Sequence, residues 1–227
     1  MNLKQISIGI YATYLTNKYG FKIKKVKTFK ERLKLRREYA EVLLDKLNIK
    51  VEVLNKERLP EDGQYLLISN HRSIIDPLII EIALQNTKVD GFWIAKKELY
   101  NSFFFGTFVR NAGCILLDRE ASHMSSFFKA TKEVVKEGHS IYIFPEGTRN
   151  KENTPLSEFK EGSRIIALKN RLPILPVYIK TNANDVLKEA IVNRTKDLKI
   201  EIEIGEIIDY KDKISLEENY RKQFIDK

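Results

Sequence analysis

The chain has 227 residues, of which 43% are hydrophobic, and its 40 Lys and Arg residues outnumber its 31 Asp and Glu residues. This length is sufficient for one large domain with a buried core. The formal charge of +9 predicts an anionic partner, which can be a nucleic acid, a membrane surface or a phosphorylated substrate. The single cysteine, Cys114, excludes an internal disulfide framework and is typical of a reducing compartment.

The N-terminal apolar run, residues 6–15, is too short to span a bilayer, and no convincing signal-peptide cleavage site follows it. No other segment approaches the ~18 apolar residues that a membrane-spanning helix requires. We therefore expect a peripheral or monotopic protein on the cytoplasmic face of a membrane.

Much of the positive charge lies in residues 1–48, which we interpret as an N-terminal basic amphipathic segment. Residues 18–37 hold ten basic side chains, opposed only by Glu31. Thr28 and Glu31 form a capping-box pattern, which predicts a helix that ends near Leu47. Such a helix suits an anionic membrane surface. The same pattern is also typical of a helix that packs on a domain by one face and keeps its charges in solvent.

From residue 51 onward, apolar segments alternate with segments of helical pattern. The predicted strands are residues 51–54, 65–69, 91–95, 114–117, 140–144, 174–179 and 199–208. The predicted helices are residues 77–85, 122–136, 159–170 and 217–225. This alternation predicts an α/β fold, in which a mostly parallel, twisted central sheet is flanked by helices. Because no linker or repeat interrupts residues 49–227, we expect one α/β domain with the N-terminal segment as an appendage.

Two polar side chains, His71 and Asp76, follow the predicted strand 65–69. The carboxyl ends of strands are the usual place for ligands in open α/β sheets. An aspartate that turned back to bond the imidazole would fix its tautomer and leave the other ring nitrogen as a general base. Asp76 followed by Pro77 is also a typical helix start, so the carboxylate could instead cap the helix. In that case His71 is a polar loop residue.

A second polar segment, Phe144 to Arg149, ends another predicted strand. Gly147 permits a tight turn that presents backbone N–H groups, and Arg149 carries a permanent charge that can hold a phosphate by two hydrogen bonds. Together with His71, this segment predicts a site that activates a hydroxyl on a phosphate-bearing substrate. A turn that carries a surface ion pair with Glu146 is the structural alternative.

Four blocks of the chain, in order, resemble those of the 1-acyl-sn-glycerol-3-phosphate acyltransferase family, within the wider group of glycerolipid acyltransferases. They are His71 with Asp76; Lys96-Lys97-Glu98-Leu99 with Gly106 and the segment Gly113 to Arg119; Phe144 to Arg149 with Phe159-Lys160-Glu161-Gly162; and Leu172 to Val177. The resemblance covers about residues 51–179, and four ordered blocks are more specific than any one of them.

The resemblance implies that His71 is the general base and that Asp76 orients it. The residues that it implies for holding the acceptor's phosphate are Glu146, Gly147, Thr148, Arg149, Arg119, Lys96 and Lys97. It also implies that Pro176 lies near the acyl donor. Without the resemblance, the two lysines are surface charges, Arg119 pairs with an acidic neighbour, and Pro176 belongs to a core strand.

The implied reaction transfers a fatty acyl group from acyl-CoA or acyl-carrier protein to the sn-2 hydroxyl of a lysophospholipid, 1-acylglycerol-3-phosphate, giving phosphatidic acid. We expect no cofactor beyond this co-substrate, and no metal, because the three histidines lack ligand spacing. Alternative acceptors are glycerol-3-phosphate, another lysophospholipid and a lyso-aminolipid. A non-catalytic basic membrane-binding protein is a further alternative. We expect no nucleic-acid partner, because no nucleic-acid-binding module is recognisable.

Overall fold

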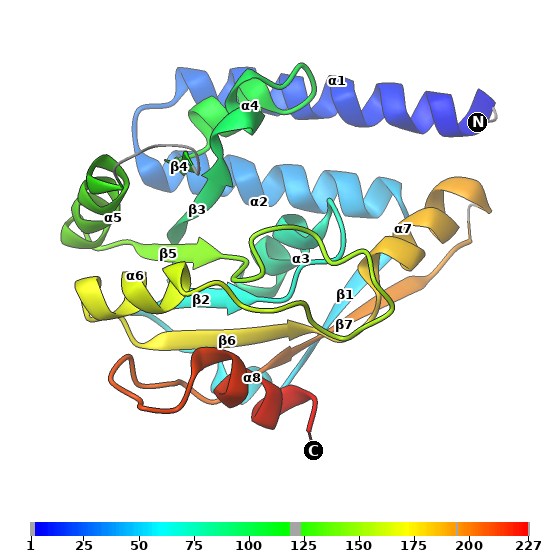
Figure 1. Ribbon diagram of the computed structural model, residues 1–227. Coiled ribbons are helices and arrows are strands. Elements are labelled where there is room, and N and C mark those ends of the chain that lie inside the picture. The colour runs from blue at the N-terminus through cyan, green and yellow to red at the C-terminus, as the bar shows by residue number, and fades with distance from the viewer. Residues whose placement is uncertain (1–2, 119–123, 194, 227) are drawn as a thin grey trace.

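In the computed structural model, which describes residues 3–118, 124–193 and 195–226, seven strands pair into one sheet in the order β1-β7-β6-β2-β5-β3-β4 (Figure 1). The strands are β1 (Ile49–Leu54), β2 (Leu66–Ser69), β3 (Gly91–Lys96), β4 (Cys114–Leu117), β5 (Ser140–Ile143), β6 (Ile174–Ile179) and β7 (Leu198–Ile204). Strands β2 to β6 are parallel to one another, and β7 runs antiparallel to β6. The predicted α/β fold with a mostly parallel sheet is confirmed.

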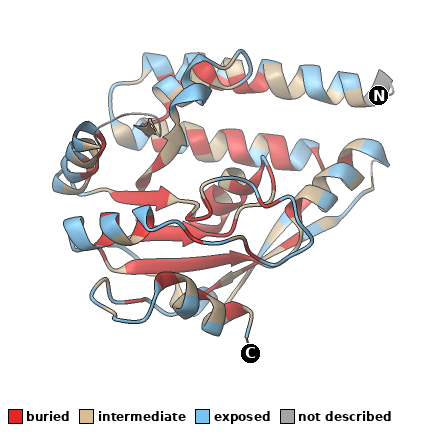
Figure 2. Cartoon of the chain, viewed as in Figure 1, coloured by how far each residue is buried: buried red, intermediate tan, exposed pale blue. Residues whose placement is uncertain are grey.

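Helices cover both faces of this sheet. They are α1 (Leu3–Lys25), α2 (Phe29–Lys46), α3 (Asp76–Ala83), α4 (Gly106–Asn111), α5 (Ser125–Lys136), α6 (Gly162–Asn170), α7 (Ala183–Val192) and α8 (Leu216–Phe224), with short 3₁₀ turns η1 (Lys56–Arg58) and η2 (Lys97–Asn101). Residues of α2, α3 and α7 form one apolar cluster with the sheet, and residues of α5, α6 and α8 form the other. Figure 2 shows the buried residues concentrated in the sheet and in the helix faces turned toward it.

The central strands are buried on both faces. All four residues of β2 and all six of β6 are buried, as expected for parallel strands between two helical layers. Such continuous apolar runs are readable in the sequence, and the predicted bounds of β4 and β6 agree with the structure. The predicted strand 199–208 was too long, because β7 ends at Ile204 and the chain rejoins the sheet only through a single bridge at Ile208.

Helix α2 belongs to the core of the domain. Its predicted capping box is present, with Thr28 and Glu31 bonded reciprocally. Its Arg36 is buried and donates from Nε to Glu81 Oε1 of α3 at 2.9 Å and from Nη1 to the carbonyl of Gly91 at 2.8 Å. A buried guanidinium requires such partners. The expectation that the N-terminal segment is an appendage was therefore wrong for α2.

Helix α1 was missed by the sequence prediction, which saw only a short apolar run. It lies over α2 and against α4 (Figure 1). A Cβ at Gly20 would lie 2.8 Å from the backbone nitrogen of Phe108, so this glycine allows α4 to approach closely. Leu15, Tyr19 and Ile23 are buried on the inner face of α1. Within the described residues, no helix combines the length and the apolar character that crossing a membrane demands.

The parallel order of the strands decides where the polar segments meet. Strand β5 lies between β2 and β3 and is parallel to both. The loops that follow Ser69, Ile143 and Lys96 therefore leave the sheet at the same edge. This edge is the usual ligand-binding side of an open α/β sheet, and it brings two sequence blocks about seventy residues apart into one site.

Candidate active site

His71 and Asp76 are in direct contact. His71 lies in the loop after β2, and Asp76 is the first residue of α3. The two side chains are joined by a hydrogen bond of 2.8 Å between Nδ1 of the imidazole and Oδ2 of the carboxylate. Because a carboxylate only accepts, Nδ1 carries a proton, and in the neutral imidazole Nε2 holds the free lone pair. Nε2 has no partner among the described residues, so it is available to a substrate.

Asp76 does not cap its own helix. The N-cap of α3 is Ile75, and no side chain bonds the helix end. Oδ2 of Asp76 instead accepts from the backbone N–H groups of Arg72 and Ser73, both at 2.7 Å. The carboxylate is buried, and its Oδ1 has no hydrogen-bond partner in the described part of the chain. Two backbone donors and a tight loop therefore aim this carboxylate at the imidazole.

The imidazole of His71 is also held by an aromatic stack. It lies on the ring of Phe144, with a centroid distance of 4.0 Å and an interplanar angle of 11°. Phe144 in turn lies on Trp93, at 5.1 Å. The indole Nε1 of Trp93 donates to Glu81 Oε1 at 2.9 Å, which ties the stack to the buried ion pair of α2 and α3. The plane of the imidazole is thus set by the core of the domain.

Glu146 holds the backbone of His71. Its Oε1 accepts from the His71 N–H at 2.6 Å, and its Oε2 accepts from the Ser157 N–H at 2.8 Å. On the other side of the same residue, the N–H of Asn150 donates to the carbonyl of His71 at 2.7 Å. The side chain of Glu146 is buried, and burial raises the pKa of its carboxyl above the ordinary value. Both carboxylate oxygens accept hydrogen bonds from the protein backbone, so the role of Glu146 is to hold the loop that carries His71.

The turn after β5 places its remaining residues at the surface. Gly147 has a φ of 70°, and its N–H donates to the carbonyl of Phe144 at 2.9 Å. Thr148 and Arg149 follow and are exposed. The guanidinium of Arg149 forms no ion pair with the residues that the structure describes, so the alternative of a surface ion pair with Glu146 is not found there. The cation is free to bind an anion beside the imidazole-bearing loop.

The other predicted residues lie in different surroundings. Lys96 is half-buried at the carboxyl end of β3, and Lys97 donates to Asp118 Oδ2 at 2.7 Å. Arg119 lies outside the described residues. Pro176 is buried within β6, paired in register with Ile68.

A match to the family model for acyltransferases covers residues 50–180 of the chain. The chain belongs to the acyltransferase family. The described geometry agrees with this result, since the matched region contains the His71–Asp76 pair and the whole turn after β5.

Several members of the family are similar to the chain. A 1-acyl-sn-glycerol-3-phosphate acyltransferase of Helicobacter pylori is 38% identical over 120 residues, which are 52% of this chain and 49% of that protein. The enzyme of the same name from Bacillus subtilis is 32% identical over 56% of this chain and 60% of its own length. The chain therefore spans about half to three fifths of these relatives.

A solved structure extends the similarity to nearly the whole fold. The crystal structure of the 1-acyl-sn-glycerophosphate (LPA) acyltransferase PlsC from Thermotoga maritima superposes with a TM-score of 0.67 at 25% sequence identity. The superposition covers 97% of this chain and 88% of that chain. The helices that precede and follow the family match are thus part of the shared architecture.

Sequence reasoning missed several residues that shape the site. Ser157 and Asn150 act through backbone N–H groups, which carry no side-chain signal in the sequence. Asn70 was passed over, although its place between a buried strand and His71 is a signal that could have found it. Its side chain bonds both the N–H and the carbonyl of Ile179 in β6.

We predict that Glu146→Ala destabilises the protein by about 2–6 kcal/mol, because two part-buried backbone N–H groups lose their acceptors at about 1–3 kcal/mol each. Equilibrium urea unfolding measures this. The raised pKa of Glu146 sets the pH dependence. The part of this stabilisation that depends on the protonation of Glu146 is complete below the unfolded-chain pKa of about 4.3 and is lost as the pH rises through the folded-state pKa, so the difference in stability from the variant narrows toward neutral pH.

The control is Glu158→Ala, which removes an exposed carboxylate that pairs with Lys160 at the surface. Its effect should stay within about 0.5 kcal/mol. A difference between the native chain and Glu146→Ala that grows with rising pH would contradict the assignment.

Proposed function

We propose that this chain is a 1-acylglycerol-3-phosphate O-acyltransferase, which transfers a fatty acyl group to the sn-2 hydroxyl of its acceptor and releases phosphatidic acid. The observation that carries the proposal is the 2.8 Å bond between His71 and Asp76, which leaves Nε2 as an oriented base. Family membership and the names of the similar proteins support the choice of acceptor.

In the proposed reaction, His71 Nε2 takes the proton of the acceptor hydroxyl while the hydroxyl oxygen attacks the carbonyl carbon of an acyl thioester. The imidazolium that forms is stabilised by the negative charge of Asp76. The tetrahedral intermediate then breaks its C–S bond, the thiolate leaves, and His71 returns the proton to it. No covalent enzyme intermediate is required, and no cofactor other than the acyl donor takes part.

The acceptor's phosphate is proposed to lie against the exposed turn after β5. Arg149 and Thr148 present a permanent charge and a hydroxyl at the sheet edge that carries His71. Lys96, Lys97 and Arg119 are further candidates for this role, as the resemblance implies. We do not propose Glu146 as a direct phosphate contact, because its oxygens are already bonded to backbone N–H groups.

The donor is proposed to be acyl-CoA or acyl-carrier protein. Pro176 remains a candidate for the donor region, and because it is buried within β6 it would shape that region as part of the strand's buried surface. Glycerol-3-phosphate, another lysophospholipid and a lyso-aminolipid are the alternative acceptors for the same chemistry. The exposed cation of Arg149, which precedes the residue that bonds the His71 carbonyl, favours an acceptor that carries a phosphate.

The outer face of α1 is proposed to lie on an anionic membrane surface. Ile10, Tyr14 and Phe21 are 66%, 60% and 55% exposed, and their spacing places them on one side of the helix. The loop before α4 adds Phe103 and Phe104, which are 82% and 54% exposed. Exposed apolar side chains on neighbouring elements are typical of a membrane or protein contact.

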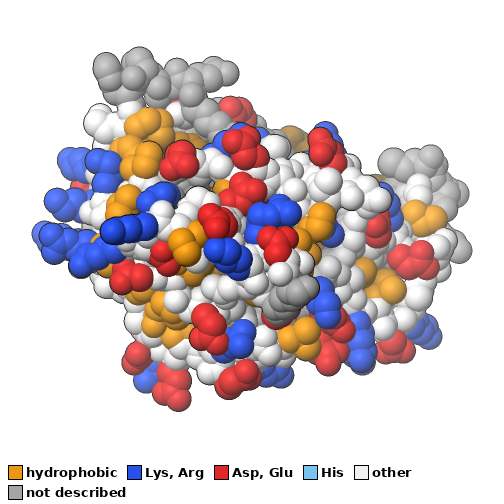
Figure 3. Space-filling model, turned by 60° about the horizontal axis from the view of Figure 1, so that its bottom comes forward, with side chains coloured by type: hydrophobic (Ala, Val, Ile, Leu, Met, Phe, Trp, Pro, Cys, Tyr) orange, Lys and Arg blue, Asp and Glu red, His pale blue; other side chains and the backbone are white. Residues whose placement is uncertain are grey.

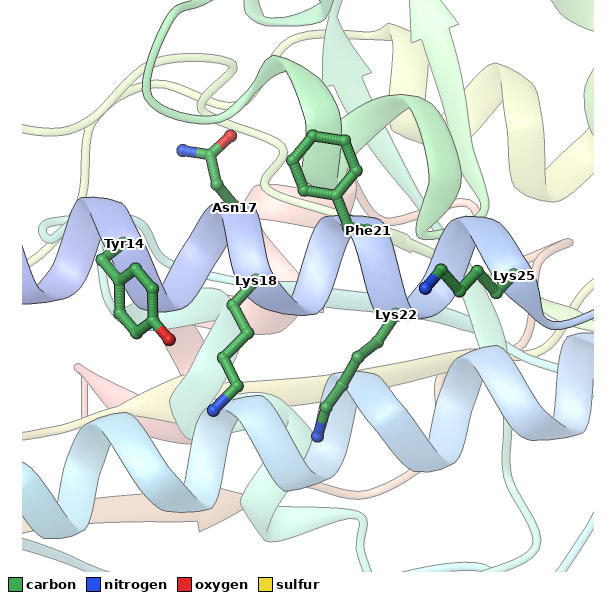
Figure 4. A pocket seen from close by; sticks show the side chains of 6 residues that line it. All are labelled: Tyr14, Asn17, Lys18, Phe21, Lys22 and Lys25. Atoms are coloured by element: carbon green, nitrogen blue, oxygen red, sulfur yellow. The ribbon is translucent and has the colours of Figure 1, made fainter.

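Lysines border this apolar stripe. Figure 4 shows Tyr14, Lys18, Phe21, Lys22 and Lys25 along one stretch of α1, with Lys18 and Lys22 turned toward α2, where Lys22 pairs with Glu38 at 3.4 Å. Aromatic rings at the interface and ammonium groups toward lipid phosphates are the usual pattern of a helix that lies on an anionic bilayer. The face in Figure 3 intersperses acidic and basic side chains over its centre and right, and it carries a group of Lys and Arg side chains at its left edge.

We predict that His71→Ala lowers acyl transfer by about 10²–10⁴-fold, the usual contribution of a general base, and leaves binding to anionic vesicles unchanged. The measurement is a radiolabelled transfer panel that crosses 1-acylglycerol-3-phosphate, glycerol-3-phosphate and a neutral lysolipid with both donors. A native protein that acylates none of these acceptors would exclude the enzymatic proposal and favour a basic membrane-binding protein.

We also predict that serine at Ile10, Tyr14 and Phe21 together weakens vesicle binding by at least about tenfold, because each apolar side chain contributes about 1.5–3 kcal/mol when fully buried. Co-sedimentation with phosphatidylglycerol vesicles measures this. The matched control places serine at Leu168, Ile207 and Ile214, which are exposed apolar residues away from α1. Equal losses in both variants would show that α1 is not the contact face.

A further inference from the structure

The direct pairing of β2 with β6 ends at Ser69, two residues before His71. The two strands are parallel, with Leu66 opposite Ile174 and Ser69 opposite Val177. The N–H of Leu66 donates to the carbonyl of Pro173 at 2.9 Å. Because hydrogen bonds in a parallel ladder recur every second residue, the same register would take the N–H of Asn70 to the carbonyl of Val177.

The hydroxyl of Tyr220 occupies this step of the ladder. The N–H of Asn70 donates to the Tyr220 hydroxyl at 3.2 Å, and that hydroxyl donates to the carbonyl of Val177 at 2.7 Å. Tyr220 comes from α8, which packs beside β6 (Figure 1). One side-chain oxygen from the C-terminal helix is therefore inserted between two strands that would otherwise bond directly.

The side chain of Asn70 replaces the next step. Its Nδ2 donates to the carbonyl of Ile179 at 3.0 Å, and its Oδ1 accepts from the Ile179 N–H at 2.8 Å. At Asn70 the backbone no longer bonds directly to β6. The side chain of Asn70 makes the next hydrogen bonds between the two segments in its place. His71 is the next residue, so the direction in which the backbone leaves the sheet at Asn70 sets where the imidazole lies.

We propose that Tyr220 is a positioning residue for His71: its inserted hydroxyl separates β2 from β6 and fixes the exit of the loop that carries the imidazole. The effect on catalysis rests on the proposed acyltransferase function. Tyr220 lies beyond residues 50–180, the part that matches the family model. The C-terminal helix thus gains a role in the site.

The surroundings of Tyr220 hold the hydroxyl in place. The side chain is fully buried, and its ring contacts those of Phe159 at 5.2 Å and Phe224 at 4.8 Å. Burial holds the pKa of Tyr220 far above the ordinary value of a tyrosine, so the hydroxyl keeps the proton that it donates to Val177. Removal of this one oxygen leaves two buried polar groups to remain unpaired or to close on each other.

The test compares the native chain with Tyr220→Phe, using 1-acylglycerol-3-phosphate as acceptor. We expect kcat to fall about 10- to 100-fold, since a displacement of about 1 Å at a catalytic group has effects of this size. KM for the acceptor should change by less than about threefold, because the phosphate contacts are untouched. Tyr178→Phe is the matched control, since Tyr178 is a buried tyrosine of the same cluster whose hydroxyl has no hydrogen bond to the described residues. It should keep the native kcat.

Two readouts need no activity and separate this proposal from the proposed function. The NMR signal of the His71 Nδ1–H, shared with Asp76, should shift or broaden in Tyr220→Phe and stay unchanged in Tyr178→Phe. In the native chain, the amide of Asn70 should exchange slowly with solvent, because it is bonded to a buried hydroxyl.

An amide of Asn70 that exchanges as fast as an exposed loop would overturn the insertion, even if Tyr220→Phe did not fold. A folded Tyr220→Phe with native kcat and a native His71 signal would overturn the positioning role, whatever its stability. A native chain without acyl-transfer activity would remove the proposed function, and the NMR comparison would then decide the role of Tyr220.

Discussion

The hydrogen bond between the Asp76 carboxylate and the His71 imidazole is the interaction on which the site depends. An imidazole in a loop has two tautomers and a freely turning ring, and neither property suits a base. Asp76 selects the tautomer that leaves Nε2 unprotonated, and two backbone N–H groups hold Asp76 in the required direction. The aromatic stack with Phe144 then limits the plane of the ring. The tautomer and the orientation of the imidazole are both set before a substrate binds.

The fold supplies this arrangement from several directions. Strand β2 delivers His71, and the turn after β5 holds its backbone through Glu146 and Asn150. Strand β6 and helix α8 hold the preceding residue, Asn70, through side-chain bonds. Because β2 lies between β5 and β6 in the sheet, its exit is controlled from both neighbours. Many of the polar groups at this edge thus bond to the loop, while the exposed Arg149 stays available for an anion.

Much of this fold could be predicted from the sequence, because its central strands are buried on both faces and read as continuous apolar runs. The contact between His71 and Asp76 could be predicted from a spacing of five residues across a strand–helix turn. The supporting roles of Glu146 and Tyr220 could not, since they depend on contacts between segments 75 and 150 residues apart. Helix α1 was not predicted, because much of its surface is polar or exposed and because it is held by packing on α2 and α4. The burial of Arg36 was not predicted either, because this residue lies in a segment rich in charged residues, which is typical of a surface.

The most direct measurement is the kcat of Asp76→Asn in the acyl-transfer assay. Asparagine keeps an oxygen where Oδ2 accepts its three hydrogen bonds, so the substitution removes the negative charge and leaves the loop in place. The account predicts that kcat falls by at least about 10²-fold, because the imidazolium loses its stabilising charge. The circular dichroism spectrum and vesicle binding should remain native. A folded Asp76→Asn with kcat within about twofold of the native chain would contradict a general base that depends on Asp76.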